Sequence, residues 1–106
     1  MNKRSLDFNS MVEFADMEEK LTGQDVNLTV DGGMSFMQCL DGFEVGIVHG
    51  AKEDFISLGG EEYEDNFMII PFSKIKYISS ETPTPISEFD TYYIQLTNKI
   101  EITLLV

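Results

Sequence analysis

The feature that most constrains this chain is a series of short apolar segments between residues 24 and 79, separated by turns that contain glycine. Residues 26–30 alternate apolar and polar side chains, which is typical of a strand with one buried face. Turn signals follow at residues 31–33 and 41–42, because glycine accepts the positive φ that tight hairpins need. The sequence therefore predicts a ribbon of short strands.

The rest of the ribbon follows the same pattern. We expect further strands at residues 34–40, 43–48, 54–58, 66–70 and 75–78. Gly46 lies inside one of them and suggests a sharp bend or a close backbone approach, and small barrels need such bends in order to close. Pro71 interrupts the apolar run before it, because proline has no N–H to donate to a ladder, and residues 72–74 then fit one tight turn. These elements predict a small, strongly bent barrel over residues 24–79.

An amphipathic helix is predicted before the barrel, over residues 10–22. Ser10 and Glu13 fit a capping box, in which each side chain satisfies a free backbone donor near the other residue. Gly23 supplies a C-terminal stop. We expect the apolar stripe of the helix to pack on the barrel, and a partner groove is the alternative. The stripe consists of Met11, Phe14, Met17 and Leu21.

A β-hairpin is predicted at the end of the chain. Residues 79–85 read as an extended linker, because the residue before a proline is disfavoured in a helix. Residues 86–106 then contain two apolar runs around a turn at Asn98 and Lys99. An isolated hairpin is barely stable in water, so this one must lie on the barrel or on another chain. We expect one mainly β domain, made of the helix, the barrel and this hairpin.

The charge of the chain limits its partners. Nineteen acidic residues against seven basic ones give a net charge of −12. Nucleic-acid affinity comes mostly from Lys and Arg, so binding to phosphate backbones is disfavoured. No apolar run is long enough to span a membrane, and no signal-like segment follows residues 1–4. The single cysteine, Cys39, cannot form an internal disulfide, and we expect a cytoplasmic protein.

The sequence contains no recognisable catalytic or metal-binding motif. His49 could act as a base and Cys39 as a nucleophile, but a loop histidine and a packed thiol are favoured because no further His or Cys lies near them. The acids at residues 61–65 could bind a cation, but their spacing does not match the calcium-binding loop. We therefore predict no enzyme, no cofactor and no metal, with the acidic segment as a solvated loop.

The order of elements between residues 10 and 79 resembles the Sm-like (LSm) fold, a family of small barrels related to SH3-like domains. The resemblance is carried by Gly46, by residues 54–58 and by residues 69–78. It implies an N-terminal helix that caps a five-stranded, strongly bent barrel. It also implies that binding residues lie at the loop positions of the family. These positions are Asp54, Ser57, Phe72, Lys74 and Lys76.

The chain departs from the RNA-binding Sm pattern in two places. Ser57 stands where the family usually has asparagine, and Pro71 with Phe72 stands where it has a basic residue and a glycine. These departures remove side chains that hold bases and phosphates in RNA-binding members. The chain is thus more similar to bacterial Sm-like and SH3-like domains of unassigned or structural role. An RNA-binding Sm-like protein is the alternative function.

Sm-like domains commonly assemble by pairing edge strands, which implies two edges here, at residues 66–70 and 75–79. An apolar strand left open invites aggregation, so either the C-terminal hairpin or a neighbouring protomer must cover it. We therefore expect a non-enzymatic binding or assembly module that forms a homo-oligomer or binds another protein. The predicted edge residues are Phe67, Met68, Ile69, Ile70 and Tyr77.

Overall fold

The computed structural model describes residues 6–61, 67–81 and 90–106, and over this part the chain is mainly β with an N-terminal helix, as predicted. No helix in these segments is long and apolar enough to cross a membrane. The elements in chain order are α1 (Phe8–Leu21), β1 (Val26–Gly32), β2 (Met34–Leu40), β3 (Glu44–His49), β4 (Asp54–Gly59), β5 (Met68–Pro71), the 3₁₀ helix η1 (Phe72–Lys74), β6 (Ile75–Glu81), β7 (Thr91–Leu96) and β8 (Glu101–Leu105).

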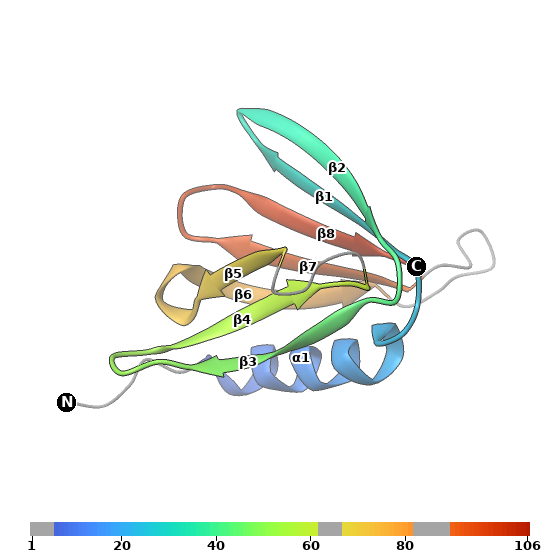
Figure 1. The fold of residues 1–106 in the computed structure, drawn as a ribbon. Helices are drawn as coiled ribbons and strands as arrows, with labels where there is room; N and C mark the ends of the chain where they lie inside the picture. Colours follow the sequence, from blue (N-terminus) through green and yellow to red (C-terminus); the bar gives the residue numbers. More distant parts are fainter. Residues whose placement is uncertain (1–5, 62–66, 82–89) are drawn as a thin grey trace.

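The described strands form two antiparallel sheets (Figure 1). One sheet has five strands in the order β2-β1-β8-β7-β6, and the other has three in the order β3-β4-β5. The turn at residues 41–43 leads from β2 in the first sheet to β3 in the second, and η1 leads back from β5 to β6. Gly42 in the first of these corners has a φ of +59°, which glycine adopts without the steric cost of a side chain.

The sheets do not close into the five-stranded barrel that the sequence predicts. Such a barrel closes when its last strand pairs with its first. Here the C-terminal hairpin lies between them, because β8 pairs with β1 and β7 pairs with β6. The hairpin is therefore confirmed and covers backbone of its own chain. The hairpin occupies the position at which the barrel would have closed. No local signal in the hairpin sequence identifies β1 and β6 as the strands with which it pairs.

The core lies between the two sheets and beneath α1. The predicted helix stripe packs inward at Phe14, Met17 and Leu21, whereas Met11 remains at the surface. Removal of these apolar side chains from water stabilises the fold by roughly 25 cal/mol per Å² of buried area. The strands contribute Val26, Leu28, Leu40, Ile56, Leu58, Ile70, Ile75, Ile78, Tyr92, Ile94, Ile102 and Leu104, and the corners contribute Phe43 and Phe72.

The helix begins two residues earlier than the sequence predicts, and Asp7 is its N-cap. One carboxylate oxygen of Asp7 accepts a hydrogen bond from the backbone N–H of Ser10 at 2.8 Å, and the other accepts one from the Ser10 hydroxyl at 3.2 Å. The predicted capping box at Ser10 and Glu13 is therefore wrong. The Ser10 hydroxyl is buried and accepts a hydrogen bond from the backbone N–H of Ile78 at 3.0 Å, which joins α1 to β6.

Two other sequence predictions differ from the structure. Gly46 marks no bend, because it pairs with Ser57 in the regular ladder between β3 and β4, and the chain turns instead at residues 41–43. A methyl group at Gly46 would meet no atom within 4 Å. The predicted linker at 79–85 starts later, since β6 continues to Glu81. The rest of that linker lies outside the described residues.

Gly46→Ala is expected to stabilise the protein by about 0.4–1 kcal/mol, because the added methyl has room and glycine loses more backbone entropy on folding. Gly60→Ala is the matched control. Its Cβ would lie 2.6 Å from the backbone oxygen of Asp41, so it should be destabilising. Denaturant unfolding of both variants measures the difference. A Gly46→Ala protein less stable than the wild type would contradict this account of the strand.

Neighbouring isoleucines in β5 provide a second test. Ile70 is 3% exposed, so Ile70→Asp should prevent folding, because an unpaired buried charge costs several kcal/mol, on the order of the whole stability. Ile69 is 47% exposed, and Ile69→Asp should change the free energy of unfolding by only about 0.5 kcal/mol. Circular dichroism and thermal unfolding distinguish the two. A cooperatively folded Ile70→Asp protein would contradict the observed orientation of β5.

Candidate functional site

The residues that the Sm-like resemblance assigns to a binding site differ in their exposure, and one of them lies in the core. Phe72 is buried in the core and cannot stack on a ligand. Asp54 begins β4 and faces His49, whereas Ser57 lies further along the strand opposite Gly46. Lys74 is exposed at the end of η1, as is Lys76 in β6. Of the five predicted positions, these two lysines are the exposed ones, and Asp54 and Ser57 are half-buried.

The same corner contains a structural link that the sequence did not reveal. The carboxylate of Glu53 accepts two hydrogen bonds from Ser73, one from the backbone N–H at 2.7 Å and one from the hydroxyl at 3.0 Å. Next to this contact, Phe55 of β4 pairs with Pro71 of β5. Together they hold the 3₁₀ turn against β4 and keep Phe72 directed into the core. Only the fold brings Glu53 and Ser73 together, so no local pattern could have predicted the pair.

His49 and Cys39 lie apart, so the structure does not assemble them into a catalytic pair. His49 ends β3, where its Nδ1 lies 3.2 Å from a carboxylate oxygen of Asp54. Cys39 is exposed on β2, and its Sγ lies 3.4 Å from a carboxylate oxygen of Asp41. The whole length of β3 separates His49 from the corner next to Cys39 (Figure 1). The two side chains therefore belong to different ends of the molecule.

The predicted acidic loop is described only at Glu61, which is exposed and whose backbone N–H donates to the carbonyl oxygen of Asp41 at 2.8 Å. The acids at 62–65 lie outside the described residues, as does Asn66 at the start of one predicted edge. Within the described segments, no group of three or more His, Cys, Asp or Glu side chains is arranged to hold a metal ion.

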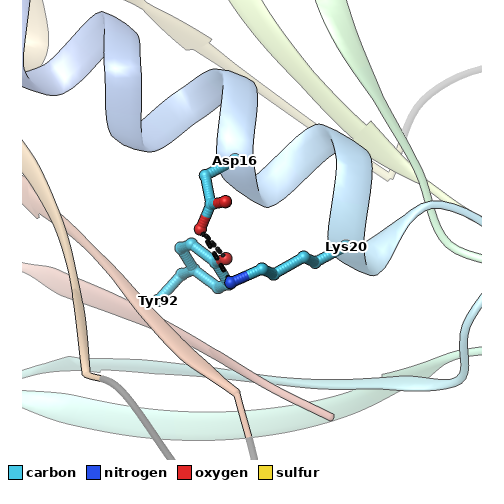
Figure 2. Close-up of polar contacts among 3 residues, drawn as sticks. All are labelled: Asp16, Lys20 and Tyr92. Atoms are coloured by element: carbon cyan, nitrogen blue, oxygen red, sulfur yellow. Dashed lines mark hydrogen bonds and ion pairs between the residues drawn. The ribbon is translucent and has the colours of Figure 1, made fainter.

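Figure 2 shows the polar contact that fixes α1 on the larger sheet. The Tyr92 hydroxyl donates to a carboxylate oxygen of Asp16 at 2.5 Å, and the Lys20 ammonium lies 3.4 Å from the same oxygen. The hydrogen bond from Tyr92 lowers the pKa of Asp16, and Lys20 acts in the same direction. Burial raises the pKa of Tyr92, and the hydrogen bond to Asp16 raises it further. The pair is thus most stable with Asp16 ionised and Tyr92 neutral.

Helix α1 also lies along one of the two predicted pairing edges, the one at residues 75–79. The helix packs against β6 of one sheet and β3 of the other. At Ile78, on the side of β6 away from β7, the backbone N–H already donates to Ser10. Tyr77 is exposed next to this position, but the strand that carries it is covered there. The predicted edge at 75–79 is therefore closed at its centre.

The second predicted edge, β5, pairs with β4 alone among the described strands. It is four residues long and ends at Pro71, which has no N–H to offer another strand. A groove of about 330 Å³ lies beside it, with Lys74 and Asn98 as its polar lining residues. The apolar lining comes from Val30, Met68, Ile69, Ile70, Pro71, Leu96, Ile100 and Ile102.

A third edge, β2, was not singled out in the sequence. It ends the five-stranded sheet and pairs with β1 alone among the described strands. None of its seven residues is charged. Phe36 is 48% exposed and Met37 is 69% exposed. The ring of Phe36 meets that of Phe67 edge to face, with centroids 6.3 Å apart, an arrangement that aromatic rings favour.

The contact between Asp16 and Tyr92 predicts losses of stability at both ends of the pH range. The pKa of Asp16 in the fold is below its ordinary 3.8, so its contribution is present above that pH and is lost as the pH falls through the folded pKa. The pKa of Tyr92 is above its ordinary 10.0, so its contribution is complete below pH 10 and is lost as the pH rises further.

Tyr92→Phe tests this directly. It should lower the free energy of unfolding by about 1 kcal/mol at neutral pH, the low end for a hydrogen bond to a charged group because Asp16 is partly exposed. It should also weaken the loss of stability above pH 10. Tyr77→Phe, at an exposed ring, is the control. Denaturant unfolding across pH provides the measurement, and an unchanged alkaline loss in Tyr92→Phe would contradict the assignment.

The sequence matches no protein-family model, and comparisons with curated proteins and with solved structures also found no match. Any functional conclusion therefore depends on the residues described above.

Proposed function

We propose that this chain is a non-enzymatic assembly module whose copies associate by pairing the edges of their β-sheets. The observation that carries the proposal is the pair of edges at β2 and β5. Each of these strands pairs with a described strand on one side alone, and each presents exposed apolar side chains. The unpaired N–H and C=O groups of an apolar edge form a template for a further strand. Association covers such an edge.

The distribution of charge supports pairing at these edges. A net charge of −12 makes most surfaces of two copies repel each other. Neither β2 nor β5 contains a charged residue, so two copies can approach there with the least repulsion. Association of this kind depends on apolar contact and backbone hydrogen bonds. It should therefore become stronger as salt screens the repulsion between the acidic surfaces.

The path of the chain supports an Sm-like origin for this module. A helix precedes the strands, β2 and β3 follow one another around a bend, and a 3₁₀ turn separates β5 from β6. In this proposal, the β7–β8 hairpin is an addition after the barrel strands that pairs between the first and the last of them, and the chain is a variant without the RNA-binding signature. The single cysteine supports a cytoplasmic location, where thiols stay reduced.

Static light scattering on the purified chain at micromolar concentration tests the proposed function. We expect a mass of at least two copies of the 12.0 kDa chain, and a larger associated fraction at higher salt. The salt series separates apolar edge pairing from charge-driven association, which salt weakens. A strict monomer across the concentration and salt series would refute the proposed function.

RNA binding, the alternative that the Sm-like resemblance implies, gains no support from the described positions, because Phe72 is buried. We expect no saturable binding of oligo-A or oligo-U at low salt, where attraction between a protein and phosphates is strongest. Fluorescence anisotropy with labelled oligonucleotides measures this. Saturable binding that weakens with added salt would favour the RNA-binding alternative.

A further inference from the structure

We infer that β2 is the strand that pairs, and that it pairs with β2 of a second copy about a two-fold axis at Met37. This inference rests on the proposed function and adds to it the edge, the partner and the register. It joins two five-stranded sheets into one continuous antiparallel sheet. Because a two-fold contact uses the same edge of both copies, assembly at this edge stops at a dimer.

The state of the other described edges favours β2. The outer edge of β6 is met by α1, where Ser10 accepts the hydrogen bond from Ile78. A head-to-tail ring that adds a strand to β6 would have to displace this buried contact. The edge of β5 is short and ends in proline, two features with which proteins protect an edge against pairing. The seven residues of β2 contain no charge and no proline.

The side chains of β2 determine the register. Ser35, Met37 and Cys39 are exposed, and Met37 is the central residue of the strand. Residues that oppose each other in an antiparallel pair point to the same face, so a shift by one residue would set the face that carries Met37 against the face on which Phe36 packs on Phe67. A two-fold pairing that uses the whole strand and keeps the faces matched sets Met37 against Met37 of the second copy. Ser35 then lies opposite Cys39, and Phe36 opposite Gln38.

Electrostatics at the proposed axis are favourable for an acidic chain. On the exposed face of the sheet, Met37 is flanked by Thr29 of β1, and Thr29 in turn by Thr103 of β8. The row of side chains that leads away from the axis is therefore uncharged in both copies. Asp31 lies toward the β1–β2 turn, away from the centre of the strand. The second copy covers Phe36 and Met37, the exposed large apolar residues of this edge.

A disulfide across the axis tests the register. Facing residues of an antiparallel pair have Cα atoms about 4.5–5.5 Å apart, within the range that a disulfide spans. Met37→Cys in a Cys39→Ser background should give a covalent dimer on mild oxidation, seen on a non-reducing gel. The matched control is Thr29→Cys in the same background, which places the thiol on the adjacent strand and the same face. It should remain monomeric on the gel.

Paired charges test the axis without covalent capture. Met37 is 69% exposed, so Met37→Lys and Met37→Glu should both fold, which circular dichroism verifies. Each variant alone sets like charges against each other and should raise the dimer dissociation constant by about tenfold or more. An equimolar mixture should restore dimers that contain one copy of each. The control Ile69→Lys places a lysine on the β5 edge instead and should leave the dimer intact.

The outcomes separate this inference from the proposed function. A dimer that the Met37→Lys and Met37→Glu variants dissociate supports both, provided that Met37→Cys forms a disulfide-linked dimer and Thr29→Cys does not. Dissociation by Ile69→Lys but not by Met37 variants would overturn the β2 inference and leave strand-edge assembly standing. A mass above two copies that persists in the Met37 variants would also overturn the β2 inference and leave strand-edge assembly standing. A strict monomer would overturn both.

Discussion

The pairing of the C-terminal hairpin with β1 and β6 determines the rest of the architecture. By lying between these strands, β7 and β8 widen one sheet to five strands and separate the two strands that would otherwise close a small barrel. The three-stranded sheet then covers only part of the larger one. Helix α1 packs against β3 and β6, and its Ser10 satisfies a backbone donor of β6 there. Among the described strands, β2 and β5 then pair on one side alone, and the proposed assembly depends on these edges.

Local structure could be predicted from the sequence wherever one segment contains its own signal. The helix follows from apolar residues at three- and four-residue spacing, and the strands follow from alternation and from turns with glycine. Ser10 and the glutamate three residues later fit a helix cap, but Asp7 provides the cap, and the Ser10 hydroxyl accepts a hydrogen bond from Ile78 instead. Gly46 inside a strand suggests a bend, but it lies in a regular ladder. In both cases the deciding contacts come from distant residues.

The candidate site was harder to predict for the same reason. The sequence shows that β2 and β5 are both apolar, but not which neighbour covers each face. The interactions that decide this are non-local: Glu53 with Ser73, Tyr92 with Asp16, and Ile78 with Ser10. The resemblance to Sm-like domains gave an order of elements, and the positions it implied for binding included Phe72, which is buried. Exposure of Phe36 and Met37 follows from the position of β2 at the end of the sheet, a property of topology.

The pairing of β1 with β8 also has a consequence for biosynthesis. Strand β1 is completed on one side by residues that are synthesised much later, since Asn27 faces Leu105. Until then β1 and β2 form a bare hairpin, which is barely stable in water. Contacts of such wide sequence separation slow folding and prolong the exposure of apolar strands. The fold of the nascent chain must therefore remain incomplete until residues 101–105 have left the ribosome, and during that interval the acidic composition keeps copies of the chain apart.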